Sequence, residues 1–169
     1  QSENNNLGIK AAIALRKRNN VNAGANIILE KNLPIASGIG GGSADCAATL
    51  KGLAQLWGLN ISVYDLNQLG LKLGSDIPIC LHGQTAFISG RGEIIKNAPL
   101  LPSFWLVLVN PGVSLSTSAV FNAYQKVHNK SWSQPGFFSD SQSTTEELAC
   151  LLDDRQNDLT DAAISLQPG

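Results

Sequence analysis

A glycine-rich loop directly before an alanine-rich apolar segment places the strongest constraint on this chain. Four of the five residues from Gly38 to Gly42 are glycine, and an apolar pattern typical of a helix runs from Cys46 through Trp57. Glycine has no Cβ and adopts positive φ angles readily, so the backbone of such a loop can approach a ligand closely. The unpaired N–H groups and the positive dipole end of the following helix then face that ligand. The pattern therefore predicts an anion site, most often for phosphate, in preference to a flexible glycine turn.

Length and composition limit what can surround this loop. The chain has 169 residues, 43% of them apolar and 15% charged, which predicts an ordinary soluble core of one domain or of one domain and part of another. The net charge of −1 gives no reason to expect nucleic acid or an anionic membrane as a partner. No apolar run approaches the ~20 residues that span a bilayer, and no signal peptide is visible. We therefore expect a cytoplasmic protein.

The cysteines favour the same compartment. Cys46, Cys80 and Cys150 are widely spaced and form no C-x-x-C pair, as expected of a reduced protein. A zinc site is not expected, because His82 and His128 are remote in sequence from the cysteines and from each other. No protein ligand for any metal is predicted.

Hydrophobic periodicity predicts a chain that mixes helices and strands. Helices are expected at residues 4–19, 43–56, 63–73, 118–127 and 144–152, with Ser43 and either Thr144 or Thr145 as N-caps. Strands are expected at residues 25–30, 85–89, 93–95 and 105–109. The last of these is a continuous apolar run, so we expect it to be buried on both faces. Residues 129–145 are expected to form a loop.

Three common phosphate loops do not fit the glycine-rich stretch. A Walker A loop requires a lysine after its last glycine, but Gly42 is followed by Ser43 and Ala44. The dinucleotide fingerprint G-x-G-x-x-G/A fails because its third position falls on Ser43 or Asp45. The glycine loop of protein kinases is excluded because the V-A-I-K and H-R-D motifs are missing.

What remains resembles the phosphate loop of the GHMP kinases, small-molecule kinases named after galactokinase, homoserine kinase, mevalonate kinase and phosphomevalonate kinase. The frame P-x-x-x-G-L-G-S-S-A of that family is occupied by Pro34, Gly38, Ile39, Gly40, Ser43 and Ala44, with Gly41 and Gly42 in its middle. Residues 69–78, 83–92 and 110–117 are similar, in order, to one branch that phosphorylates 4-diphosphocytidyl-2-C-methyl-D-erythritol. The resemblance spans about residues 5–125 and continues weakly to about residue 167.

The resemblance implies an α/β (α+β) architecture, the GHMP-kinase fold. Residues 1–102 would form most of a ribosomal-S5-like catalytic and ATP-binding domain. Residues 103–169 would begin a ferredoxin-like α+β domain on the substrate side. The implied reaction is ATP-dependent phosphorylation of the 2-hydroxyl of the cytidyl-erythritol substrate, in the non-mevalonate route to isoprenoid precursors, by a monomer or homodimer.

The same resemblance implies roles for individual residues. Asp76 matches the base that accepts the proton of the substrate hydroxyl, which is sound chemistry for phosphoryl transfer to an alcohol. Lys31, Thr117 and Ser118 match regions near the cytidine and erythritol ends of the substrate. ATP would bring Mg²⁺, for which no protein ligand is named. The ATP-phosphate loop would comprise Pro34, Ile35, Ala36, Ser37, Gly38, Ile39, Gly40, Gly41, Gly42, Ser43 and Ala44.

The chain also departs from the family pattern. It shows neither the opening strand P-A-K-x-N, whose lysine lies beside the catalytic aspartate, nor the later glycine-rich motif of the G-S-G-A type. It begins with Gln1 and contains no methionine. We therefore expect a fragment of a longer kinase that lacks both ends and is inactive alone.

Two alternatives stay open. The first is another GHMP kinase of the homoserine or mevalonate type, against which the triple glycine and the stretch L-G-S-D-I-P at residues 73–78 argue. The second is a non-catalytic module that keeps the phosphate loop, and the retention of Asp76 argues against it.

Overall fold

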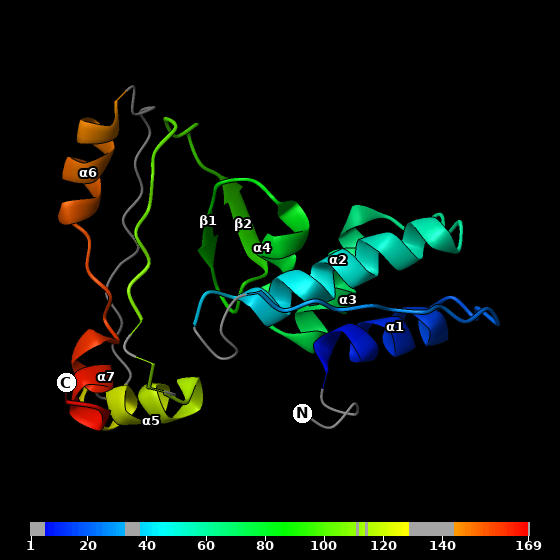
Figure 1. Cartoon of the computed structure of the whole chain (residues 1–169), viewed down its shortest axis with the longest axis horizontal. Coiled ribbons are helices and arrows are strands. Elements are labelled where there is room, and N and C mark those ends of the chain that lie inside the picture. Colours follow the sequence, from blue (N-terminus) through cyan, green and yellow to red (C-terminus); the bar gives the residue numbers. More distant parts are fainter. Residues whose placement is uncertain (1–5, 33–37, 111, 114, 129–143, 169) are drawn as a thin grey trace. The chain divides into compact units, whose positions relative to one another are not determined.

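The computed structural model describes residues 6–32, 38–110, 112–113, 115–128 and 144–168 (Figure 1). The chain divides into two compact units, Gln1–Asn97 and Ala98–Gly169, which are described separately. We call them the first and the second unit. No helix within the described ranges is long and apolar enough to cross a membrane.

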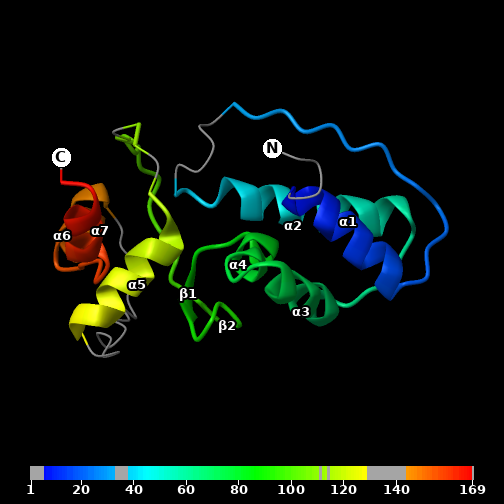
Figure 2. The same ribbon diagram turned by 90° about the horizontal axis from the view of Figure 1, so that it is seen from below.

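The first unit is a layer of helices followed by a short hairpin. Figure 2 shows the helix α1 beside α2, with α3 and α4 on the same side of α2. The antiparallel strands β1 and β2 follow α4, and Ser89 pairs with Ile94 next to the turn. The bounds are α1 (Leu7–Arg18), α2 (Gly41–Leu56), α3 (Val63–Leu73), α4 (Ile77–His82), β1 (Ala86–Ser89) and β2 (Ile94–Asn97).

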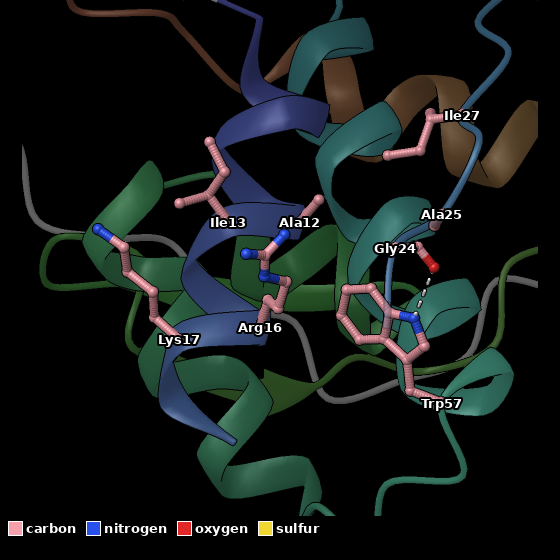
Figure 3. Close-up of a pocket in the computed structure, with 8 residues that line it drawn as sticks. All are labelled: Ala12, Ile13, Arg16, Lys17, Gly24, Ala25, Ile27 and Trp57. Carbon is pink, nitrogen blue, oxygen red and sulfur yellow. Dashed lines mark hydrogen bonds between the residues drawn. The ribbon is translucent and has the colours of Figure 1, made fainter. Parts of the chain in front are cut away.

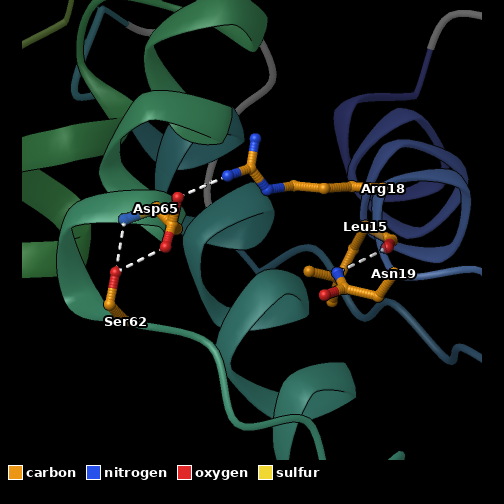
Figure 4. Close-up of polar contacts among 5 residues, drawn as sticks. All are labelled: Leu15, Arg18, Asn19, Ser62 and Asp65. Carbon is orange, nitrogen blue, oxygen red and sulfur yellow. Dashed lines mark hydrogen bonds and ion pairs between the residues drawn. The ribbon is translucent and has the colours of Figure 1, made fainter.

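Local side chains fix the starts of two of these helices. Asn6 caps α1, because its Oδ1 accepts a hydrogen bond from Gly8 N at 2.8 Å. Ser62 caps α3, because its Oγ accepts from Asp65 N at 3.0 Å and donates to the Asp65 carboxylate at 2.7 Å. Arg18 then forms an ion pair with Asp65, which joins the end of α1 to the start of α3 (Figure 4).

The core of the first unit lies where the four helices meet. Leu15, Leu50 and Ile77 are fully buried and come from α1, α2 and α4. Gly70 of α3 lets α4 approach, since a Cβ there would lie 2.8 Å from Ile77 Cγ2. The burial of these apolar side chains provides the main stabilisation of the unit.

Within its described residues, the second unit contains the helices α5 (Thr117–His128), α6 (Thr145–Asp153) and α7 (Thr160–Leu166). Val120 and Tyr124 of α5 pack with Ala162 of α7 in a small core. Thr144 begins α6 with a capping box, in which its Oγ1 accepts from Glu147 N and its own N–H donates to the Glu147 carboxylate.

The helices and hairpin predicted from periodicity are confirmed, but two predicted strands are wrong. Residues 25–30 and 105–109 are exposed and belong to neither strand of the described sheet. Trp105 is 99% exposed and Val107 is 89% exposed, which contradicts the expected burial on both faces. An apolar β-prone run forms a strand only when a neighbouring strand satisfies its backbone. Residues 129–143 lie outside the described ranges.

One helix start and two short helices also differ from the prediction. Helix α2 begins at Gly41, so Ser43 lies inside it and Gly40 is the N-cap. The six-residue α4 and the seven-residue α7 were not expected. Helices of fewer than two turns carry too few apolar positions to show a 3.6-residue period.

Candidate functional site

The described part of the glycine-rich loop turns directly into helix α2. Gly38 and Gly40 adopt φ angles of 77° and 73°, in the left-handed region that favours glycine. A Cβ added at either position would meet nothing within 4 Å, so the loop backbone faces open space. The N-cap residue Gly40 has no side chain that could cap the helix. The first backbone hydrogen bond of the helix runs from Ala44 N to Gly40 O at 3.0 Å.

This geometry leaves the first N–H groups of α2 available to an anion. The amides of Gly41, Gly42 and Ser43 precede the first helical hydrogen bond, and the positive end of the helix dipole adds to their attraction. Ile39 is 46% exposed beside them, and Ala44 is exposed one residue further on. The predicted loop residues Pro34, Ile35, Ala36 and Ser37 lie outside the described residues.

Lys31 lies over the first turn of α2. Its Nζ is 2.6 Å from Asp45 Oδ2, and a Cβ added at Gly41 would lie 3.5 Å from the same Nζ. Both side chains are partly exposed, at 31% and 28%. A cation therefore stands at the end of the helix where negative ligands are favoured, held there by a carboxylate one turn further along.

Asp76 occupies the corner between α3 and α4. It is exposed and is the N-cap residue of α4, although its side chain makes no capping hydrogen bond. Ser75 Oγ donates to Asp76 Oδ1 at 3.5 Å. The backbone carbonyl of Asp76 accepts from Cys80 N at 3.3 Å, which closes the first turn of α4. The carboxylate thus remains accessible to a ligand.

Burial and neighbouring groups raise the pKa values of two thiols on α4 and α2. Burial raises the pKa of the Cys80 thiol, and the Asp76 carboxylate raises it further. Burial raises the pKa of the Cys46 thiol to about 11, with an additional contribution from Cys80. Cys46 is five residues into α2, about 8 Å along the helix from Gly41.

The remaining predicted residues belong to the second unit. Thr117 and Ser118 form the first turn of α5, and both are exposed. The Oγ atoms of Ser116 and Ser118 lie 2.9 Å apart. The structure thus groups Lys31, the described loop residues and Asp76 in one unit and places Thr117 and Ser118 in the other.

A pocket of about 270 Å³ lies near the opposite end of α2 (Figure 3). Trp57 Nε1 donates a hydrogen bond to Gly24 O at 3.3 Å there, and Arg16 and Lys17 of α1 supply two cations. The 16 residues of α2 span about 24 Å, so this pocket is separate from the glycine loop. The other lining residues are Ala12, Ile13, Ala25 and Ile27.

Comparison with known proteins identifies the family of this site. The family described as GHMP kinases N terminal domain matches residues 6–84, a range that includes the loop, Lys31 and Asp76. The chain is 43% identical to 4-diphosphocytidyl-2-C-methyl-D-erythritol kinase of Parvibaculum lavamentivorans over 99% of this chain and 58% of that protein. It is 44% identical to the same enzyme of Paramagnetospirillum magneticum over 96% of this chain and 56% of that protein. By these matches the chain is similar to the GHMP kinases, most directly over residues 6–84.

The fold agrees with this assignment. A crystal structure of 4-(cytidine 5'-diphospho)-2C-methyl-D-erythritol kinase superposes with a TM-score of 0.68 and 28% identity, over 99% of this chain and 59% of that one. The predicted GHMP-kinase fold is therefore confirmed. The chain spans less than three fifths of the length of each of these relatives.

Two features of the site were not foreseen from the sequence. Asp45 pairs with Lys31, 14 residues earlier in the chain, which no sequence pattern indicated. The contact between Ser75 and the hairpin turn, described below, also escaped prediction. The described residues contain no cluster of three or more metal-ligating side chains.

Proposed function

We propose that this protein is an ATP-dependent kinase that phosphorylates the 2-hydroxyl of 4-diphosphocytidyl-2-C-methyl-D-erythritol. The observation that carries the proposal is the juxtaposition of two elements in the first unit. An open, left-handed glycine loop begins α2, and the exposed Asp76 begins α4, which packs against α2. The sequence similarity to kinases of that name supports the choice of substrate.

The loop would bind the phosphates of ATP. The amides at the start of α2, from Gly41 onward, donate hydrogen bonds that need no reorganisation, and the open space at Gly38 and Gly40 admits the phosphate oxygens. Residues Pro34 to Ala44 form this loop in the proposal. Lys31 would add positive charge at the same helix end and contact the substrate or the nucleotide.

Asp76 would act as the base. Its carboxylate orients the substrate hydroxyl and accepts its proton as the hydroxyl oxygen bonds to the γ-phosphorus. The bond between the γ-phosphorus and the β,γ-bridging oxygen breaks in the same transfer, and ADP leaves with that electron pair. Thr117 and Ser118, both exposed hydroxyl side chains, would contribute hydrogen bonds to the substrate.

Mg²⁺ would accompany ATP. Magnesium usually takes one or two protein carboxylates and completes its shell with phosphate oxygens and water. Asp45 is already paired with Lys31, so the nucleotide and water would supply most of the ligands. When bound, the ion neutralises charge on the phosphates.

The test uses the full-length protein with MgATP and the cytidyl-erythritol substrate. ADP release and the appearance of a new phosphomonoester signal by ³¹P NMR are expected together. Homoserine and mevalonate are assayed in parallel, since turnover of either in place of the cytidyl substrate would assign the protein to another branch of the family. ATP binding without turnover of any of the three would favour a non-catalytic phosphate-binding module.

A further inference from the structure

The turn between β1 and β2 presses against the residue that precedes Asp76. Gly92 is buried and adopts a φ angle of 107°. A Cβ added to it would lie 2.0 Å from the carbonyl oxygen of Ser75, 3.0 Å from its carbonyl carbon and 3.4 Å from its Cα. The backbones of the hairpin turn and of the corner before α4 are therefore in direct contact.

From this contact we propose that Gly92 is a positioning residue for Asp76, and the inference rests on the proposed function. The turn limits the movement of the Ser75–Asp76 peptide by steric contact. Through that peptide it fixes the position of the Asp76 carboxylate. Nothing in the family comparison or in the sequence pattern assigned a role to this turn beyond joining two strands.

The opposite side of the corner is anchored by the helical core. Ile77 and Pro78 are buried immediately after Asp76, and Ile77 N donates to Gly74 O at 3.3 Å. The Ser75–Asp76 segment is thus held between the core and the turn. Among the described residues, the side chain of Asp76 has only the long 3.5 Å contact from Ser75 Oγ to orient it. The backbone of Ser75 and Asp76 therefore sets the position from which the carboxylate extends.

The turn is built to resist displacement. Arg91 N donates to the Glu93 carboxylate at 2.6 Å, and Gly92 N donates to Ser89 O at 3.3 Å. The antiparallel pairing of Ser89 with Ile94 closes the hairpin directly behind it. A side chain at residue 92 would therefore push on the Ser75 carbonyl rather than distort the turn alone.

The expected displacement is large on the scale of catalysis. Restoring even a 3.0 Å contact from 2.0 Å requires a shift of about 1 Å. Misplacement of a reacting group by about 1 Å can reduce turnover about 100-fold. The three atoms nearest an added Cβ at Gly92 all belong to Ser75 and none to the described loop residues, so binding of ATP should change little.

The experiment compares Gly92→Ala with Gly83→Ala in the full-length protein. Gly83 follows α4 at its other end with a φ angle of 68°, and a Cβ there comes no closer than 4.0 Å to another residue, Lys51 Nζ. In both variants the alanine must adopt a positive φ angle, but only the Cβ at residue 92 would clash with the Ser75 carbonyl oxygen. We expect Gly92→Ala to lower kcat about 100-fold with the KM for ATP within twofold. Gly83→Ala should keep kcat within about twofold despite a lower Tm.

Several outcomes would overturn the inference. A folded Gly92→Ala protein with unchanged kcat would do so, as would equal losses of kcat in the two variants. If Gly92→Ala does not fold, Glu93→Ala serves as the test. It removes the hydrogen bond from Arg91 N to the Glu93 carboxylate that holds the turn, without adding a side chain at residue 92. A fall in kcat at constant KM supports the inference, and an unchanged kcat in that variant overturns it.

A readout without catalysis separates this inference from the proposed function. If the unaltered full-length protein does not turn over the cytidyl substrate, the proposed function fails. The amide NMR shifts of Ser75 and Asp76 then test the contact itself. These shifts should change in Gly92→Ala and remain unchanged in Gly83→Ala. The reverse pattern would refute the contact between the turn and Ser75.

Discussion

Lys31 Nζ lies 2.6 Å from Asp45 Oδ2, so a residue before the glycine loop is paired with one in the second turn of the helix after it. The pair bridges the two ends of the proposed phosphate loop. Its partly exposed position implies a small contribution to stability, of about 1 kcal/mol or less. Its main effect is to hold a cation beside the start of α2.

The first prediction concerns this cation. Lys31→Met should weaken ATP binding about tenfold, because it removes a positive charge and leaves the Asp45 carboxylate near the phosphates. The melting temperature should change little. Isothermal titration with a non-hydrolysable ATP analogue measures the effect, and Lys51→Met, an exposed lysine further along α2, is the control. Equal effects of the two substitutions would contradict a specific role for Lys31.

The second prediction concerns the proposed base. Asp76→Asn should reduce turnover by about 10²- to 10⁴-fold, because an amide does not accept the hydroxyl proton. ATP affinity and Tm should remain near those of the unaltered protein, since Asp76 is exposed and makes no capping hydrogen bond. Steady-state kinetics with nucleotide titration separates the two effects. Near-normal turnover would remove Asp76 from the role of base.

The third prediction concerns the loop. Gly40→Val should weaken ATP binding by more than about tenfold, because a β-branched side chain would occupy the open space beside the amides of α2. The left-handed φ of 73° adds a strain of about 1–3 kcal/mol.

Gly58→Val provides the matched control for this loop variant. Gly58 has a φ of 59°, also lies in open space and follows the other end of α2. Gly58→Val should lower the free energy of unfolding by an amount similar to Gly40→Val, but its affinity for ATP should remain unchanged. Unchanged ATP affinity in Gly40→Val would count against the loop assignment.

The fourth prediction separates two helical glycines by what surrounds them. Gly52 is exposed on α2 with nothing within 4 Å of an added Cβ, so Gly52→Ala should raise the free energy of unfolding by about 0.5–1 kcal/mol. Gly70→Ala should lower it by about 1–3 kcal/mol, because the methyl group would meet Ile77 at 2.8 Å. Denaturant unfolding of both variants measures the difference, and a stabilising Gly70→Ala would refute the tight packing of α3 on α4.

The fifth prediction concerns alkaline stability. Burial raises the pKa of the Cys46 thiol from an ordinary value of 9.0 to about 11. Above pH 9 the unfolded thiol loses its proton while the folded thiol retains it, so the free energy of unfolding should fall as the pH rises from 9 to 11. Below pH 9 both states keep the proton, and this contribution to stability is fully present.

Cys46→Ala isolates that contribution. Other groups also titrate in this range, so the measurement is the difference in slope between the unaltered protein and Cys46→Ala from pH 8 to 11. The variant should lose stability more gradually with pH. Parallel slopes would show that Cys46 does not cause the alkaline destabilisation.

Local sequence determined much of this fold. Thr144 or Thr145 ahead of Glu146 and Glu147 predicted a cap for α6, which Thr144 and Glu147 form. The strands predicted at residues 85–89 and 93–95 form the hairpin. Both rest on interactions within a few residues, which a pattern can contain. Residues 25–30 and 105–109 have strand composition, but strand formation depends on partners remote in sequence.

The same reasoning explains which parts of the site were predictable. The glycine loop and Asp76 carry motif-level signals, and both appear where a ligand could reach them. The pair of Lys31 with Asp45 and the contact of Gly92 with Ser75 arise from how helices and hairpin pack. Neither spacing differs from that of many unrelated residue pairs, so no local pattern marks them.

The exposed run from Phe104 to Val109 has a consequence for handling the protein. It is six residues long, contains no charge and no proline, and consists of aromatic, leucine and valine residues. Segments of this composition are prone to intermolecular cross-β stacking when they are accessible to solvent. Preparations of residues 1–169 should therefore lose monomer with rising concentration, and a charged substitution at Trp105 should slow that loss.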